Sequence, residues 1–155
     1  MEVFRICKYK RARDLSGYGS GIKGARWNRR GTFLLYTASH RSLALLEVLV
    51  HMGGEYYPEE EYAIVTLEIP EKSIIELDDK ILPQNWFKIS DPASQAIYTD
   101  EWLKEEKSIA MSVPSAIINQ ERNYLINPQH PDFQNVKIKN IEKFTFDERF
   151  FKDVI

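Results

Sequence analysis

The chain has 155 residues, and 21 Lys and Arg stand against 23 Asp and Glu, which gives a formal charge of −2. Its 43% hydrophobic and 12% aromatic content excludes general disorder. No apolar run approaches the roughly 20 residues of a membrane-spanning helix, and the first ten residues lack the apolar segment of a secretory signal. The single cysteine, Cys7, cannot form an internal disulfide. We expect a soluble, cytoplasmic protein with one domain over residues 1–155.

Positive charge is concentrated at the start of the chain. Residues 1–31 carry nine Lys and Arg against two acidic residues, a net charge of +7, and the rest of the chain carries −9. The same segment holds Gly17, Gly19, Gly21 and Gly24, so backbone amides and cations could meet a phosphate there. The alternative is a solvated face offset by the acidic remainder, and a pI near 6.0 argues against a nucleic-acid binder.

The first third of the chain predicts two strands separated by a loop. Residues 1–9 are rich in Val, Phe and Ile, which favour a strand. Residues 10–30 are expected to form mainly loops, because several glycines interrupt the segment. Residues 32–37 (TFLLYT) form a short apolar run that is typical of a buried strand.

A helix is predicted next, followed by two more strands. Ser39 is placed to cap the start of this helix, and Gly53 follows its end. The apolar residues between them cover more than one face, so we expect the helix to be buried. Residues 62–69 (YAIVTLEI) alternate well, and residues 73–77 (SIIEL) follow after a proline, so both segments are expected to be strands.

The second half of the chain predicts another helix and further strands. Asp91 and Pro92 are typical of a helix start, and the helix is expected to reach about Lys107. Residues 109–118 are apolar but contain a proline, which favours an edge or broken strand, and residues 136–146 alternate like a late strand. The chain therefore predicts an α+β (mixed α/β) fold around a sheet.

Several sequence blocks, taken in order, resemble one known family. They are GARWN at 24–28, YTA at 36–38, ALLEVLVH at 44–51, VPSA at 113–116, NYLINP at 123–128 and HPDF at 130–133. This ordered set resembles the RES domain, which is named for an arginine, a glutamate and a serine and is the toxin half of RES–Xre toxin–antitoxin pairs. The corresponding residues here are Arg26, Glu47 and Ser115. Ala25 is a small departure, because the family often has a second glycine there.

The resemblance implies a central β-sheet with flanking helices, similar to the ADP-ribosyltransferase toxins. It implies that NAD⁺ is a substrate, not a bound cofactor, and that the nicotinamide–ribose bond is cleaved. Phosphate, water or a protein side chain would then accept the ADP-ribosyl group. The implied protein partner is an Xre-type antitoxin that blocks the active site, and DNA would be bound only through that antitoxin.

The resemblance and the chemistry together predict Arg26 and Glu47 as the catalytic residues. Nicotinamide leaves from a cationic pyridinium, so no general acid is needed and one carboxylate can stabilise the cationic transition state. Glu47 lies in the mostly apolar run LALLEVLV, where a charge is costly unless it is paired or functional. Its alternatives are a solvent-facing position or an ion pair. The planar fork of Arg26 suits a pyrophosphate or a ribose.

Tyr36, Ser115, Asn28 and Asn127 are the predicted substrate-binding residues. Tyr36 can stack on nicotinamide and offer its hydroxyl to the ribose, or it can be a core tyrosine. Ser115 can hydrogen-bond the nicotinamide amide, the ribose or Glu47. Asn28 can contact the ligand or hold its loop, and Asn127 can also hold a turn or a pocket wall.

No metal site is predicted. His51 follows Glu47 by four residues, but no second pair of ligands has a suitable spacing. Cys7 is interpreted as an inert core thiol and Trp27 as a core residue. Two non-enzymatic alternatives stay open, namely a nucleic-acid-binding module that uses the basic segment 1–31 and a scaffold that contacts a partner.

Overall fold

The structure, a computed structural model, describes residues 1–55, 57–89 and 91–151. Its strands are β1 (Glu2–Lys8), β2 (Leu35–Ala38), β3 (Tyr62–Glu68), β4 (Ile74–Glu76), β5 (Ala110–Pro114), β6 (Arg122–Ile126) and β7 (Lys137–Phe144). Its α-helices are α1 (Tyr18–Lys23), α2 (Arg41–Met52) and α3 (Ile97–Glu105). Within the described residues, none of these helices is long and apolar enough to cross a membrane.

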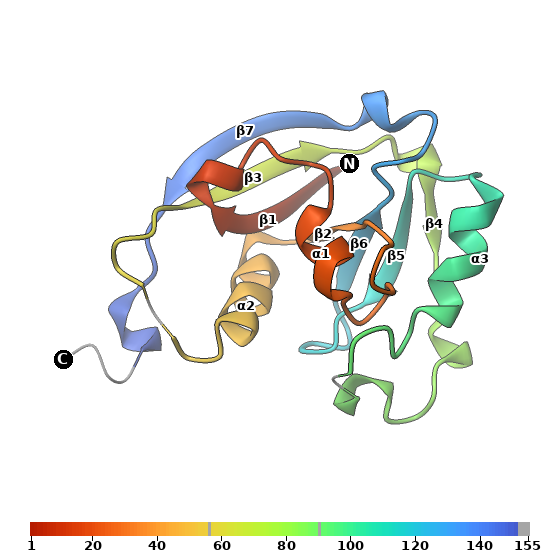
Figure 1. The fold of residues 1–155 in the computed structure, drawn as a ribbon, viewed down its shortest axis with the longest axis horizontal. Coiled ribbons are helices and arrows are strands. Elements are labelled where there is room, and N and C mark those ends of the chain that lie inside the picture. Colours follow the sequence, from red (N-terminus) through yellow and green to blue (C-terminus); the bar gives the residue numbers. More distant parts are fainter. Residues whose placement is uncertain (56, 90, 152–155) are drawn as a thin grey trace.

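The strands form one mixed sheet in the order β4-β5-β6-β2-β1-β3-β7. The β4–β5 pair is parallel, and the other neighbouring pairs are antiparallel. Helices α1 and α2 lie beside the middle of the sheet, and α3 lies beside the β4 end (Figure 1). The predicted mixed α/β fold around a sheet is confirmed.

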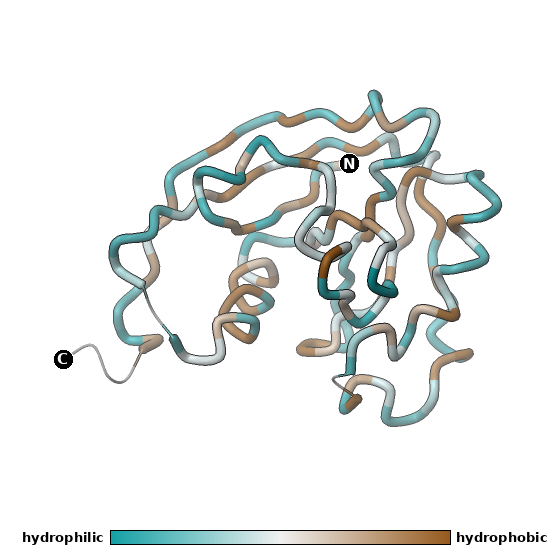
Figure 2. Tube along the Cα trace, in the orientation of Figure 1, coloured by the Kyte–Doolittle hydropathy of each residue, from teal (hydrophilic) through white to brown (hydrophobic). Residues whose placement is uncertain are grey.

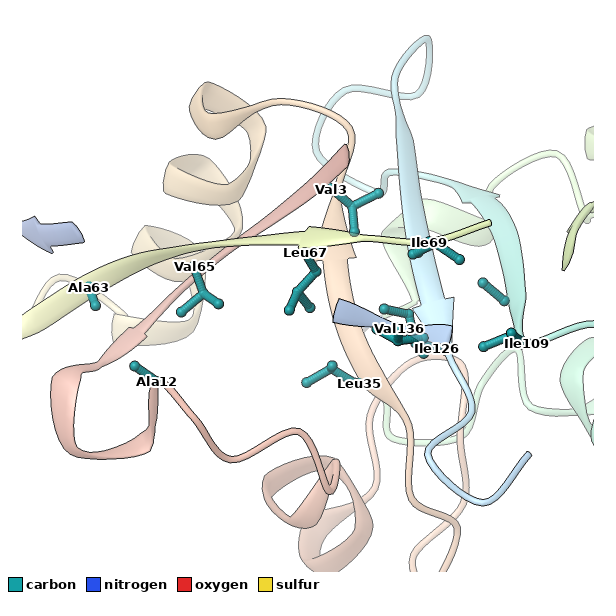
Figure 3. Close-up of a cluster of buried hydrophobic side chains, with 11 residues drawn as sticks. Val3, Ala12, Leu35, Ala63, Val65, Leu67, Ile69, Ile109, Ile126 and Val136 are labelled. Atoms are coloured by element: carbon teal, nitrogen blue, oxygen red, sulfur yellow. The ribbon is translucent and has the colours of Figure 1, made fainter. Parts of the chain in front are cut away.

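Alternating strand residues build the core. Ala63, Val65 and Leu67 project from one face of β3 and are fully buried (Figure 3), because successive side chains of a strand point to opposite faces. They pack with Val3 of β1 and Leu35 of β2 in one cluster. A second cluster joins α3 to β5 and β6 through Trp27, Trp86 and Trp102. The second cluster therefore packs α3 against the β5 and β6 part of the sheet.

Helix α2 differs from its prediction in two ways. It begins at Arg41 after His40, whose side chain makes no capping bond, and Ser39 Oγ lies 2.9 Å from His40 Nδ1 instead of capping the helix. The predicted full burial is also wrong. Figure 2 shows apolar residues recurring along α2, but only Leu43 and Ala44 are buried in it, and Val50 is 62% exposed. The helix is amphipathic and presents one stripe to the sheet.

Helix α3 begins later than predicted. Residues 91–96 form turns instead of the first helical turn, because Ala93 has a φ of +62° that a right-handed helix does not accept. The backbone N–H groups of Ala93 and Gln95 donate to the carbonyl oxygens of Ala25 and Arg26, both at 2.8 Å. The segment before α3 is thereby fastened to the loop that carries Arg26.

Strand β5 is an interior strand, so the edge alternative of its prediction is wrong, and the strand is broken off at Pro114 as the other alternative predicted. It pairs with β4 on one side and β6 on the other, and all five of its residues are buried. Pro114 is the last residue of β5, where the missing N–H interrupts no continuing strand. The sequence patterns also missed α1 and β6. In α1, Gly21 packs so closely on Phe33 that a Cβ would lie 2.4 Å from the ring.

Candidate active site

A cavity opens where the sheet splits between β1 and β2. Among the residues that the structure describes, these strands are paired only at Phe4 and Ala38, whereas β1 pairs with β3 along its whole length. The cavity has a volume of about 540 Å³ and is lined by residues of β1, α1, β2 and α2. This volume is in the range of small-molecule sites.

The cavity is lined by more positive than negative side chains. Arg5, Lys8, Arg11 and Lys23 face two carboxylates, those of Asp14 and Glu47. These cations all come from the basic segment 1–31, so folding places much of its charge at one cavity.

Some of these cations also have partners within the chain. Arg5 donates to the carbonyl oxygens of Asp14 at 2.9 Å and Arg11 at 3.1 Å, which fixes the turn after β1. Lys8 Nζ donates to Glu60 at 2.8 Å, and this bond raises the pKa of Lys8. The lining favours an anionic ligand whose negative charge lies toward β1 and α1.

Glu47 of α2 is held by two hydrogen bonds to one of its oxygens. Ser115 Oγ donates to Glu47 Oε1 at 2.9 Å, and Asn123 Nδ2 donates to the same atom at 2.5 Å. Ser115 Oγ accepts bonds from the N–H groups of Ile117 and Ile118, so its own proton points to Glu47. No donor within residues 1–55, 57–89 and 91–151 occupies Glu47 Oε2. The carboxylate is therefore anchored at one oxygen and available at the other.

Tyr36 joins the strand β2 to the loop before it. Its hydroxyl donates to Asn28 Oδ1 at 2.7 Å and accepts from the N–H of Trp27 at 3.1 Å. Burial raises the pKa of Tyr36 well above its usual range, so the group stays a neutral hydroxyl. Tyr36 lines the cavity, and its hydroxyl is hydrogen-bonded to the loop that contains Trp27 and Asn28.

Asn28 takes the loop-holding role that the sequence left open. It is fully buried, and its amide donates to the carbonyl oxygens of Ser20 at 3.0 Å, Arg29 at 3.2 Å and Thr32 at 2.7 Å. Together with the bond from Tyr36, these contacts use both ends of the amide. Direct binding of substrate by Asn28 stays a prediction.

Arg26 is directed toward the loop before α3. Its guanidinium donates to the carbonyl oxygens of Trp86 and Ile89. Burial lowers the pKa of Arg26, and the negative charge of Glu47 partly opposes this shift, so Arg26 and Glu47 are within electrostatic reach of each other. Arg26 stays a cation at any ordinary pH, although it does not line the cavity.

Asn127 lies at the opposite end of β6 from Asn123 and does not line the cavity. Its Oδ1 accepts from the N–H of Gln129 at 3.0 Å, which forms a local turn. His130 extends this turn, because its Nδ1 accepts from the N–H of Asp132 and its Nε2 contacts the carbonyl oxygen of Glu106. The structure thus shows the turn-holding alternative for Asn127, and substrate binding by this residue stays a prediction.

Two cavity residues were not identified correctly from the sequence. In the sequence, Asn123 stands out only as part of the NYLINP block at residues 123–128, and no pattern marks its side chain as a partner of Glu47. Cys7 is a half-buried free thiol that packs against the core, as predicted, and it also lines the cavity, which the sequence did not indicate. Trp27, by contrast, is buried against Trp86 with ring centroids 5.5 Å apart, which confirms its predicted core role.

The described residues contain no group of three or more His, Cys, Asp and Glu side chains that could hold a metal ion. The cavity combines one oriented carboxylate, a tyrosine ring and a set of cations.

Comparisons with known proteins bear on the fold and the family. A structure from M. tuberculosis, described as the crystal structure of the MbcT–MbcA toxin–antitoxin complex, matches with a TM-score of 0.76 at 18% identity. The match covers 93% of this chain and 84% of that chain, which confirms the fold.

Relatives at higher identity cover nearly the whole chain. A Toxin Res of Yersinia enterocolitica is 36% identical over 96% of this chain and 99% of its own length. A Toxin Res of Pseudomonas putida is 33% identical over 97% and 100%. A protein of Sphingobium sp. named Prs ADP-ribosylating toxin is 34% identical over 91% and 89%. The RES domain model matches residues 2–147, and the chain belongs to the RES domain family.

Proposed function

We propose that this chain is the toxin of a toxin–antitoxin pair and that it breaks the nicotinamide–ribose bond of NAD⁺. The observation that carries the proposal is the Glu47 carboxylate, anchored through Oε1 beside a cavity that also holds four cations. Such a cavity can hold a dinucleotide with its pyrophosphate among the cations and its ribose near the carboxylate. Relatives that are 33–36% identical carry the name Toxin Res.

Glu47 supplies the main group that the cleavage step requires, a carboxylate near the ribose. The bond between ribose C1′ and the pyridinium nitrogen breaks, and its electron pair leaves with neutral nicotinamide. Positive charge then develops on the ribose, and a carboxylate close to it lowers the energy of this transition state. Tyr36 offers its ring as a surface for nicotinamide, because its hydroxyl is already bound to Asn28.

Inorganic phosphate or water is the proposed acceptor of the ADP-ribosyl group. An acceptor oxygen forms the new bond to C1′ and loses its proton to the solvent. Lys8, Arg11 and Lys23 line the same cavity as Glu47 and favour an anionic acceptor as well as the pyrophosphate.

A second candidate is transfer of the ADP-ribosyl group to a protein side chain. The observation that favours it is the name of the Sphingobium relative, Prs ADP-ribosylating toxin, at 34% identity. Both candidates share the cleavage step at Glu47 and differ only in the acceptor. Neither candidate needs a resident cofactor.

An antitoxin of the Xre type is the proposed partner, and it would neutralise the toxin by covering the cavity. The solved structure that shares this fold is described as a toxin–antitoxin complex. In this arrangement any contact with DNA belongs to the antitoxin.

Product analysis tests these proposals. The purified chain, freed of any bound partner, is incubated with NAD⁺ with and without phosphate, and nicotinamide and the ADP-ribose species are separated by chromatography. We expect nicotinamide in both cases and ADP-ribose phosphate only with phosphate. Labelled NAD⁺ added to a cell lysate tests transfer to protein. Failure to release nicotinamide in all three experiments would contradict the proposed function.

A further inference from the structure

We propose that Asn123 is a positioning residue that fixes the orientation of the Glu47 carboxylate. Asn123 Nδ2 lies 2.5 Å from Glu47 Oε1, and 76 residues separate the two in the sequence. The inference rests on the proposed function of Glu47 in cleaving NAD⁺. It adds a residue to the site that acts through Glu47 and not on the substrate.

The orientation of the Asn123 amide follows from its partner. A carboxylate only accepts hydrogen bonds, so the NH₂ group of the amide faces Glu47 and the carbonyl oxygen Oδ1 is turned away. Asn123 is 9% exposed, and Oδ1 is buried. No donor in the part of the chain that the structure describes reaches Oδ1. The acceptor end of this side chain is therefore unused.

A buried acceptor without a donor lowers the stability of a fold. Asn28 shows the opposite arrangement, because its carbonyl oxygen accepts from Tyr36 and its amide donates to three backbone carbonyl groups. Asn28 therefore stabilises its loop, whereas the side chain of Asn123, within the described residues, donates to Glu47 alone. This contrast assigns Asn123 to the site and not to the stability of the sheet.

The surroundings make Asn123 a rigid support. It lies in β6, where it pairs with Ala38 of β2 and Val113 of β5. Ser115, which follows β5, donates to the same oxygen of Glu47. Two donors from one hairpin thus fix the end of a side chain that comes from α2, and they leave Glu47 Oε2 for the substrate.

The test compares Asn123→Leu with the wild-type chain. Leucine has a similar shape but neither the donor nor the buried acceptor. We expect kcat for nicotinamide release to fall roughly 10- to 100-fold, as is typical when an orienting partner of a reacting group is lost. KM should stay within about threefold, and Tm should not fall. A merely structural role would lower Tm and leave kcat nearly unchanged.

Asn123→Asp provides a second variant of nearly the same shape. An acceptor replaces the donor, so two carboxyl groups meet and share one proton. Arg26, Tyr36 and His51 are further titratable groups near Glu47, and the cavity also holds Arg5, Lys8, Arg11, Lys23 and Asp14. We expect the activity lost at neutral pH to recover in part as the pH is lowered, and Asn123→Leu should show no such recovery.

Thr66→Val is the matched control. Thr66 Oγ1 is also a buried acceptor without a donor among the described residues, but Thr66 lies in β3 and does not line the cavity. The control should keep wild-type kcat with an equal or higher Tm. Full activity in both Asn123 variants, with Glu47→Ala inactive, would overturn this inference and leave the proposed function intact.

A substrate-free measurement keeps the two proposals separate. Carbon-13 NMR couplings of the Glu47 side chain report whether it holds one rotamer. We expect a single rotamer in the wild-type chain and rotamer averaging in Asn123→Leu. Unchanged couplings in Asn123→Leu would contradict the positioning role, whether or not the chain releases nicotinamide. Absence of nicotinamide release would count against the proposed function and not against the positioning role.

Discussion

Ser115 Oγ donates a hydrogen bond to Glu47 Oε1 at 2.9 Å, although 68 residues separate them in the chain. Ser115 is fully buried, and its oxygen accepts from two backbone N–H groups of the turn that follows it. Of the three partners that the sequence allowed for Ser115, the structure shows Glu47. The serine and the glutamate of the family set therefore form one unit at the cavity.

This relationship predicts a double effect of Ser115→Ala. The variant removes a donor from Glu47 and also leaves the N–H groups of Ile117 and Ile118 without their acceptor. We expect the free energy of unfolding to fall by roughly 1–3 kcal/mol, together with a lower kcat. Urea unfolding and nicotinamide release measure the two effects. Unchanged stability would mean that the turn does not depend on Ser115.

Tyr36→Phe separates the two roles of Tyr36. The variant keeps the ring but removes the hydroxyl that serves Asn28 Oδ1 and the N–H of Trp27. We expect a loss of roughly 1–3 kcal/mol in the free energy of unfolding and a KM for NAD⁺ close to that of the wild-type chain. Tyr36→Ala should raise KM as well. Equal loss of turnover in both variants would show that the hydroxyl acts on the substrate.

Arg26→Lys tests whether the guanidinium fork is needed. Arg26 donates to two backbone carbonyl groups at once, those of Trp86 and Ile89, and a lysine ammonium cannot reproduce this planar geometry. Loss of a charge-assisted hydrogen bond is typically worth roughly 1.5–3 kcal/mol, so we expect the free energy of unfolding to fall by about this amount. We also expect a lower kcat/KM, because Arg26 is a predicted catalytic residue. Steady-state kinetics of the lysine variant provide the measurement. Wild-type kinetics in that variant would remove Arg26 from the site.

Two glycines that line the cavity should respond oppositely to alanine. Gly17 has a φ of +69°, and a Cβ there would lie 2.8 Å from the backbone of Leu34. We expect Gly17→Ala to destabilise the chain by roughly 2 kcal/mol or more. Gly19 has nothing within 4 Å of a built Cβ and lies in α1, so Gly19→Ala should be neutral or stabilising by roughly 0.5–1 kcal/mol. Thermal unfolding of the matched pair tests this account of the loop.

Much of the fold could be predicted because local patterns decide it. Residues 62–69 alternate clearly, and β3 follows at Tyr62–Glu68 with its alternate residues in the core. The start of α3 could not be predicted, since alanine is not a residue that signals a positive φ, yet Ala93 adopts one where its N–H bonds to Ala25. The interior position of β5 depends on long-range pairing with β4 and β6. A local pattern does not show this pairing, and Pro114 favoured an edge strand instead.

Some residues of the candidate site could likewise be predicted from the sequence, and others could not. Glu47 stood out because a charge in an apolar helix is costly, and Ser115 came from the family resemblance. Asn123 reaches Glu47 only because β6 lies next to β2 and brings its side chain to α2, and no spacing in the sequence encodes that meeting. The deviation of β1 from β2, which opens the cavity, is equally a property of the assembled sheet.

Nicotinamide release by the wild-type chain and by Glu47→Gln tests the central claim most directly. Glutamine keeps the size of the side chain and an oxygen that can accept from Ser115 and Asn123, but it carries no negative charge. The account predicts that the wild-type chain releases nicotinamide from NAD⁺ and that the variant, folded with an unchanged circular dichroism spectrum, releases it roughly 10²–10³-fold more slowly. Equal rates in the two proteins would contradict the account.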